Sequence, residues 1–364
     1  MFEKYPFEKL NELLRGIEPE SEKRYILTIG EPQFETPGFI QKALCENSKY
    51  LNKYPKTAGE EMLKEAQRGF VKRRYGIELN KNELLPTFGT RELLFNFPLF
   101  LKPKKMAFPN PFYQIYEGAA IAAGSNINYM PLNKKNGFKN TVSQLDGDEE
   151  LVILNSPNNP TASVMNMDEL CEWVEYAVKN DVVILSDECY SELYFNEKPP
   201  SILEASVKAG NKNFKNILAI NSVSKRSSAP GLRSGFIAGD AEILKNYLQF
   251  RTYVGCASPV PLQLAAAKAW DEDSHVEIFR KEYKKNFEVA KDILGVEIPD
   301  ATFYIWLEVD DDIEFTKKAW KRGVKVMPGR FMGRKGAGEG YVRIALVYSA
   351  EETKEALKII KELL

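Results

Sequence analysis

The pattern of apolar and polar positions divides the chain into two parts. Between about residues 80 and 250, short runs that are apolar on both faces alternate with stretches of helical spacing. This alternation is typical of a buried, mainly parallel sheet that is covered by helices. The pattern predicts strands at 106–108, 127–130, 151–154, 182–185, 217–220 and 236–238, and helices at 113–124 and 167–180.

After residue 255 the pattern changes to that of a smaller α+β unit. The first 45 residues carry little strand signal, and we assign them to the same unit. We therefore expect an α/β protein with a large domain, residues 46–254, and a small domain formed by residues 1–45 plus 255–364. In the small domain the spacing predicts helices at 261–270, 274–294, 313–322 and 351–364, and strands at 303–309, 324–327 and 341–347.

Composition narrows the classes of partner. The chain has 364 residues, which suits about two domains. Its 50 Lys and Arg balance 51 Asp and Glu, so neither nucleic acid nor an anionic membrane is an expected partner. No apolar run approaches the roughly 18 residues of a membrane helix, and the N-terminus lacks the apolar core of a signal peptide. We expect a cytoplasmic protein.

Cysteine and histidine usage argues against several chemistries. The four cysteines are scattered and form no CxxC pair, so neither a disulfide framework nor a zinc site is expected. The sole histidine, His275, follows a polar, acidic stretch, which predicts a surface position in the first turn of a helix. A Ser-His-Asp triad or a multi-histidine metal site is therefore not expected.

The strongest chemical signal is a lysine in a hydroxyl-rich segment. Lys225 follows the apolar run 217–220 and the residues Ser222 and Ser224, and Arg233 lies eight residues further on. A lysine in this setting suits a Schiff base beside a bound phosphate, because burial or nearby cations lower its pKa and make the amine nucleophilic. Arg233 offers a bidentate fork to the phosphate. These residues predict a pyridoxal-phosphate enzyme.

Further candidates lie where predicted strands end. Asp187 could hold the pyridine nitrogen of the cofactor in its protonated form, and Tyr190 could reach the ring O3′. Asn159 could donate to the same oxygen. Gly89 and Thr90 precede an apolar helix that we expect to begin near residue 93, where backbone amides could cradle phosphate. Each has a structural alternative, respectively a cap, a half-buried aromatic residue, a turn before proline and a helix N-cap.

Arg343 lies inside the apolar run 341–347, where a charge is rarely buried without a partner. We expect it to bind a substrate α-carboxylate. The alternative is an ion pair with a carboxylate of the protein.

Together these motifs resemble the class I/II aminotransferases of the fold-type I pyridoxal-phosphate family. The resemblance runs from about residue 30 to residue 347. Each motif is weak alone, but their order and spacing are specific. They are Gly30-Glu31-Pro32, Tyr54 with Gly59, Gly89-Thr90-Arg91, Tyr113, Asn159-Pro160-Thr161, Asp187 with Tyr190, Ser222-Val223-Ser224-Lys225, Arg233 and Arg343.

The resemblance implies a seven-stranded, mainly parallel sheet, pyridoxal 5′-phosphate, amino-acid and 2-oxo-acid substrates, and a homodimer. It implies that Lys225 forms the Schiff base and moves the proton, with Asp187 and Tyr190 completing the catalytic set. Tyr113 is then expected to stack on the ring, and Tyr54 to reach the site of the second subunit. The implied cofactor-binding residues are Tyr54, Gly89, Thr90, Arg91, Tyr113, Asn159, Asp187, Tyr190, Ser222, Ser224, Lys225 and Arg233, and the implied substrate-binding residues are Gly30, Asn159 and Arg343.

One position departs from the family pattern, because Ala162 stands where a glycine is usual. If that position needs a positive φ, alanine carries strain of roughly 1–2 kcal/mol.

Residues 224–236 most resemble the bacterial succinyldiaminopimelate aminotransferases of lysine biosynthesis, which implies N-succinyl-LL-2,6-diaminopimelate and 2-oxoglutarate as substrates. Transamination of aspartate or another amino acid, and a carbon–sulfur lyase on the same fold, stay open as alternatives. For a distal substrate carboxylate, charge alone makes Arg226, Arg330 and Arg334 candidates.

Overall fold

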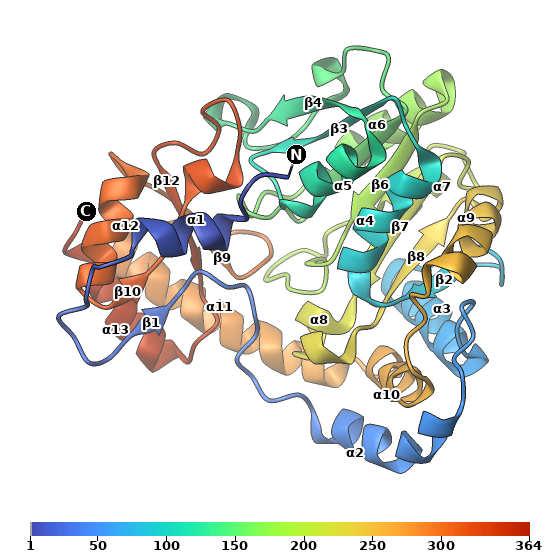
Figure 1. Ribbon diagram of the computed structural model, residues 1–364, viewed down its shortest axis with the longest axis horizontal. Helices are drawn as coiled ribbons and strands as arrows, with labels where there is room; N and C mark the ends of the chain where they lie inside the picture. Colours follow the sequence, from blue (N-terminus) through green and yellow to red (C-terminus); the bar gives the residue numbers. More distant parts are fainter. Residues whose placement is uncertain (1) are drawn as a thin grey trace.

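The computed structural model describes residues 2–364, and its centre is one large sheet (Figure 1). Within those residues this sheet has seven strands in the order β2-β8-β7-β6-β5-β3-β4. Only β8 runs antiparallel to its neighbours, so the expected mainly parallel α/β sheet is confirmed. The strands are β2 (Leu84–Thr87), β3 (Lys105–Asn110), β4 (Asn126–Pro131), β5 (Leu151–Asn155), β6 (Val183–Asp187), β7 (Ile217–Ser222) and β8 (Gly235–Gly239).

Helices bury both faces of this sheet, as strands that are apolar on both sides require. In β5, Val152 and Leu154 pack into the core on one face, whereas Leu151 and Ile153 pack into the core on the other. The first face is covered by α2 (Gly38–Asn47), α3 (Glu61–Tyr75), α6 (Met167–Asn180), α7 (Ile202–Lys208) and α10 (Val260–Asp271), and the second by α4 (Gly89–Leu101), α5 (Ile115–Ala123) and α9 (Ala241–Val254).

A smaller unit is built around a three-stranded antiparallel sheet in the order β11-β12-β9, beside a parallel pair formed by β1 and β10. Its own apolar core lies between these strands and the helices α11 and α13. The elements are α1 (Pro6–Leu13), β1 (Tyr25–Ile26), α11 (Ser274–Leu294), β9 (Tyr304–Glu308), α12 (Asp312–Lys321), β10 (Val324–Lys325), β11 (Met327–Pro328), β12 (Tyr341–Ala345) and α13 (Ala350–Lys361).

Three local expectations were wrong. The run 324–327 is not one strand, because β10 pairs with β1 and β11 pairs with β12, with the buried Val326 between them. Helix α4 begins at Gly89 rather than near residue 93. His275 does lie in the first turn of α11, but only 6% of it is exposed, because its ring turns inward to Glu272 and Ser227.

The division into domains at residues 45/46 and 254/255 stays a prediction. Helices α2 and α10 pack on each other and on α3, and they share the core beneath the large sheet. We propose that a division by packing counts both helices with the large domain. Within residues 2–364, no helix is both long and apolar enough to cross a membrane.

Candidate active site

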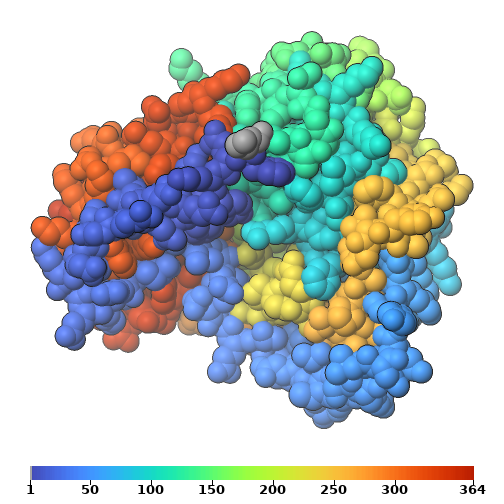
Figure 2. Space-filling model, viewed as in Figure 1, coloured from blue at the N-terminus to red at the C-terminus, as the bar shows by residue number. Residues whose placement is uncertain are grey.

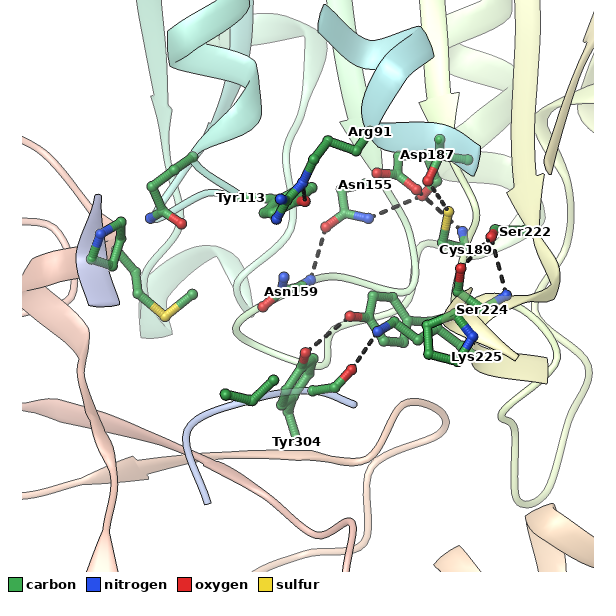
Figure 3. Close-up of a pocket in the computed structure, with 18 of the residues that line it drawn as sticks. Arg91, Tyr113, Asn155, Asn159, Asp187, Cys189, Ser222, Ser224, Lys225 and Tyr304 are labelled. Carbon is green, nitrogen blue, oxygen red and sulfur yellow. Dashed lines mark hydrogen bonds between the residues drawn. The ribbon is translucent and has the colours of Figure 1, made fainter. Parts of the chain in front are cut away.

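A cavity of about 450 Å³ opens where the parallel strands of the large sheet end (Figure 3). Asn155, Asp187 and Ser222 end β5, β6 and β7, and all three line it. Tyr304 of β9 and Arg343 of β12 line it from the smaller unit. The carboxyl ends of parallel strands and the smaller antiparallel sheet therefore enclose the candidate residues between them.

Lys225 projects into this cavity from α8 (Val223–Arg226), a short helix that directly follows β7. The Ser222 hydroxyl caps the helix by accepting from the Ser224 amide at 3.1 Å. The Lys225 amine donates to the Gly30 carbonyl and lies 6.0 Å from the centre of the Tyr190 ring. Burial lowers the Lys225 pKa to about 8. A neutral, nucleophilic amine is therefore accessible near neutral pH.

Asp187 lies at the floor of the cavity, where it is buried. Its carboxylate accepts from the Tyr116 hydroxyl at 2.8 Å and from the Cys189 amide at 3.2 Å. Burial raises the Asp187 pKa, while these hydrogen bonds favour the ionised form. An ionised carboxylate at this position would be further stabilised by a cation in contact with it, and a protonated pyridine nitrogen meets that need.

Two guanidinium groups that line the cavity, those of Arg91 and Arg233, have no carboxylate partner within residues 2–364. Arg233 donates to two carbonyls, Pro230 at 2.8 Å and Phe88 at 3.3 Å, and forms no ion pair with a carboxylate among the described residues. Burial lowers its pKa, and the nearby Arg91 lowers it further. Gly89 leaves room for Arg233, because a Cβ there would lie 2.3 Å from Nη2. Two neighbouring cations at a cavity wall fit a bound anion.

Hydroxyl groups also line the cavity, and a helix begins beside Arg233. Thr90, Ser222 and Ser224 line it, and the 13-residue helix α4 begins at Gly89, whose φ is +72°. Helix N-termini favour anions through their free amides and dipole. The residues present therefore fit the phosphate of pyridoxal phosphate, and the buried Asp187 carboxylate fits its ring nitrogen.

Arg343 is 4% exposed, and it contacts two oxygens. Nη1 donates to the Asn159 side-chain oxygen at 2.6 Å, and Nη2 donates to the Thr28 carbonyl at 2.5 Å. Its guanidinium lies 4.4 Å from the centre of the Tyr304 ring. No carboxylate of the described residues pairs with it, so the ion-pair alternative for Arg343 was wrong. A buried guanidinium that faces a cavity is suited to a carboxylate ligand.

Aromatic rings lie near the amine of Lys225, which is 6.0 Å from the centre of the Tyr190 ring and 5.8 Å from that of Phe303. Tyr190 and Tyr304 share a hydrogen bond of 2.9 Å. Gly30 lies against Tyr304 and Phe303, so that a Cβ at Gly30 would clash with the Tyr304 hydroxyl group. Tyr113 lines the cavity beside Arg91, whose Nε donates to the Tyr113 hydroxyl at 2.9 Å (Figure 3).

Two residues expected from the resemblance do not line the cavity of this chain. Gly89 packs against the guanidinium of Arg233 instead. Tyr54 is fully exposed. Its expected place in a second subunit's site, and the homodimer itself, stay predictions.

The candidates for a distal carboxylate proved to be paired with acidic residues of the protein, and none lines the cavity. Arg226 contacts Asp273 at 2.6 Å, Arg330 contacts Asp312 at 2.6 Å, and Arg334 contacts Glu117. Selecting them by charge alone was therefore wrong.

Ala162 does adopt the left-handed conformation that its position was suspected to need, with φ +62°. The turn still forms, because the Ala162 amide donates to the Asn158 carbonyl at 3.0 Å. The neighbouring Asn159 keeps its amide bonded to the Asn155 side chain at 2.8 Å.

Sequence reasoning missed several residues of the site. Asn155 pairs with Asp187 in the sheet register, so the rule that ligands bind at strand ends could have found it. Tyr116, Cys189 and Tyr304 carry no comparable signal, since each is one apolar or aromatic residue in an ordinary core pattern.

Comparison with known proteins agrees with this geometry. The family model "Aminotransferase class I and II" matches residues 23–360. The chain belongs to this family. It is therefore an aminotransferase that uses pyridoxal 5′-phosphate and acts on amino acids and 2-oxo acids.

Individual relatives in this family are similar to the chain over nearly its whole length. The solved structure of the aminotransferase AspB from Helicobacter pylori is 48% identical, has a TM-score of 0.96 and covers 100% of this chain and 98% of its own. That of an aminotransferase from Neisseria meningitidis is 40% identical, has a TM-score of 0.94 and has the same coverage. An LL-diaminopimelate aminotransferase from Natranaerobius thermophilus is 32% identical over 98% of this chain and 96% of its own.

Proposed function

We propose that this aminotransferase carries out its chemistry at the cavity around Lys225, with the residues in the roles given below. The observation that carries the proposal is the Lys225 amine, with its lowered pKa, inside a cavity that Asp187 and Arg233 also line. When bound, pyridoxal phosphate supplies an electron-withdrawing ring that stabilises negative charge on the substrate Cα.

The residues of the chain divide the remaining work. Arg233 and the start of α4 would bind the phosphate, and Asp187 would keep the ring nitrogen protonated. Arg343 and Asn159 bind and orient the substrate carboxylate, which directs the Cα–H bond. With the cofactor bound, Lys225 would take the proton from the substrate Cα and deliver it to the cofactor carbon that carries the amino group, because its amine is a basic group inside the cavity.

For the substrate we propose an acidic donor, with N-succinyl-LL-2,6-diaminopimelate as the leading candidate and 2-oxoglutarate as acceptor. Two observations support this choice. Residues 224–236 resemble the succinyldiaminopimelate aminotransferases, and the relative from Natranaerobius thermophilus is an LL-diaminopimelate aminotransferase. Aspartate stays the alternative.

A second cation at the mouth of the cavity supports an acidic substrate. Arg91 forms no ion pair with a carboxylate in residues 2–364, and its contacts there are the hydroxyls of Tyr113 and Tyr5 at 2.9 and 3.3 Å. The N-terminal segment, drawn in the darkest blue, extends from the smaller unit toward the large one (Figure 2), and Tyr5, Pro6 and Phe7 line the cavity together with Arg91. We propose that Arg91 and Tyr5 bind the distal acidic group of the substrate, in place of the cofactor-binding role that the resemblance implies for Arg91, and that the cofactor phosphate is left to Arg233 and the start of α4.

A panel of amino donors against 2-oxoglutarate tests the substrate proposal. N-succinyl-diaminopimelate, LL-diaminopimelate, aspartate and an aromatic amino acid are compared by kcat/KM, in the wild type and in Arg91→Gln. We expect the succinylated donor to react fastest, and Arg91→Gln to slow acidic donors selectively. An equal loss for acidic and aromatic donors would refute the role of Arg91, and faster turnover of another donor would refute the leading substrate. Release of pyruvate and ammonia from cystathionine would instead favour the lyase alternative.

A further inference from the structure

The residue after Lys225 is an arginine buried to an unusual degree. Arg226 is 0% exposed, and its guanidinium lies 4.9 Å from the centre of the Phe70 ring and 5.3 Å from that of Trp270. It donates to the Ala269 carbonyl at 2.5 Å and to the Asp273 carboxylate at 2.6 Å. A fully desolvated arginine is costly unless it is paired and hydrogen-bonded, so these contacts hold it in one place.

The following residue makes a second contact with the same region. The Ser227 hydroxyl lies 2.8 Å from Nε2 of His275, and Nδ1 of His275 contacts the Glu272 carboxylate. Because a carboxylate can only accept, Nδ1 carries the proton, and neutral His275 then accepts from Ser227 through Nε2. Burial lowers the His275 pKa. The charged groups that face the ring are Glu272, Asp273 and Arg226.

This serine, histidine and glutamate resemble a hydrolytic triad in composition, but Ser227 cannot act as a nucleophile. It is 0% exposed, and it does not line the cavity. The group is internal, and its role must be exerted through the protein.

The contacts converge on the junction between two helices. Asp273 and Glu272 lie between the end of α10 and the start of α11, and His275 is in the first turn of α11. Helix α10 packs on α2 and α3 against the large sheet, whereas α11 packs on α13 in the smaller unit. The short helix α8, which carries Lys225, is therefore in contact with the segment through which the chain passes from the large unit to the smaller one.

We propose that Arg226 and His275 are positioning residues that clamp the Lys225 turn to the junction between α10 and α11. The clamp holds the Lys225 amine at a fixed place in the cavity and links its place to the relative position of the two units. The inference rests on the proposed role of Lys225. The charge of Arg226 made it a candidate for substrate binding, but its guanidinium contacts the Ala269 carbonyl and the Asp273 carboxylate instead.

The test compares His275→Phe with His275→Gln in the full-length holoenzyme. Phenylalanine removes both hydrogen bonds, whereas the glutamine amide can still reach Ser227. Phe287→Leu is the control for lost stability, because Phe287 is buried on the same helix in the core of the smaller unit. Urea unfolding measures the loss of stability in each variant.

Two quantities report on the amine itself. One is the rate of the half-reaction at saturating amino donor, followed by cofactor absorbance without acceptor. The other is the pH midpoint for acetylation of Lys225 in the cofactor-free chain, measured by peptide mass spectrometry. We expect His275→Phe to lower the rate by about tenfold or more, because small displacements of a reacting group have effects of that size, and to move the acetylation midpoint. Donor affinity stays the same, and His275→Gln recovers most of the rate.

The proposal would be overturned if His275→Phe had the same half-reaction rate and the same acetylation midpoint as Phe287→Leu. It would also be overturned if His275→Gln were as slow as His275→Phe. If His275→Phe does not fold, Asp273→Asn is the second variant, since Asp273 is partly exposed and its loss weakens the Arg226 contact. An unchanged rate in folded Asp273→Asn would overturn the Arg226 part. Lys225→Ala distinguishes a failure of the proposed function from a failure of the clamp. If the half-reaction still proceeds in this variant, the role of Lys225 is refuted rather than the clamp.

Discussion

Replacement of Lys225 by methionine should change how the stability of the cofactor-free chain depends on pH. Burial lowers the Lys225 pKa from the ordinary 10.5 to about 8. Between these values the unfolded chain holds the proton and the folded chain does not. The free energy of unfolding of the wild type therefore rises with pH in this window. Below pH 8 the folded chain carries the full cost of a buried ammonium group.

The size of this effect follows from the shift. A difference of about 2.5 pKa units corresponds to about 3 kcal/mol. Applying the linkage relation to these two pKa values leaves roughly 2 kcal/mol of change between pH 7 and pH 9.5. Lys225→Met removes this contribution, so the stability advantage of the variant over the wild type should shrink by that amount across the same range. The lost hydrogen bond to Gly30 shifts the difference equally at both pH values.

Urea unfolding of wild type and variant at fixed protein concentration, at pH 7 and at pH 9.5, measures this difference. Lys208→Met is the matched control, because Lys208 is exposed and its pKa is raised by Asp168 rather than lowered. The difference in unfolding free energy between Lys208→Met and the wild type should therefore not shrink between pH 7 and pH 9.5 as it does for Lys225→Met. A difference between wild type and Lys225→Met that is the same at both pH values would refute a buried amine with a lowered pKa.

Substitutions at three further positions probe other parts of the site. Arg343→Met should lower kcat/KM for amino donors by a factor that corresponds to about 2–5 kcal/mol, since the substrate carboxylate loses a buried partner; unchanged steady-state kinetics would argue against that role. Tyr116→Phe removes a hydrogen bond to Asp187, worth about 1.5–3 kcal/mol for a charged acceptor, and should weaken cofactor binding about tenfold in a direct titration. Equal cofactor affinity would show that this bond does not matter. At Ala162, glycine should change the free energy of unfolding by less than about 1 kcal/mol, because strain relief offsets a lost buried methyl group. Valine there should be clearly destabilising, and a stable valine variant would contradict the positive φ.

Most of the large sheet could be predicted because its strands are apolar on both faces, a pattern that few other structures produce. Strand β2 escaped the pattern, since it is short and contains Pro86. Proline weakens a strand assignment except at a sheet edge, and β2 is an edge strand. The residues 324–327 show the opposite error, because an apolar run does not reveal that its halves pair with different partners.

The candidate site was predictable where chemistry requires unusual residues in unusual places. A lysine after an apolar strand and an arginine inside one both stand out, and Lys225 and Arg343 meet in one cavity. The supporting residues could not be found this way. Tyr304 acts through its contacts with Tyr190 and Arg343, which only the folded chain brings together. His275 was misplaced because its polar neighbours in sequence suggested solvent, while its partner Ser227 is 48 residues away.

The central claim is that Lys225 performs amino-group transfer in this cavity. Its most direct test is a single half-reaction, in which holoenzyme is mixed with an amino donor and no acceptor, and the 2-oxo acid formed is counted against enzyme sites. We predict 2-oxo acid in an amount equal to the sites in the wild type, together with conversion of the cofactor to its aminated form, and neither at a comparable rate in Lys225→Ala. Equal product formation at an equal rate in Lys225→Ala would contradict the account.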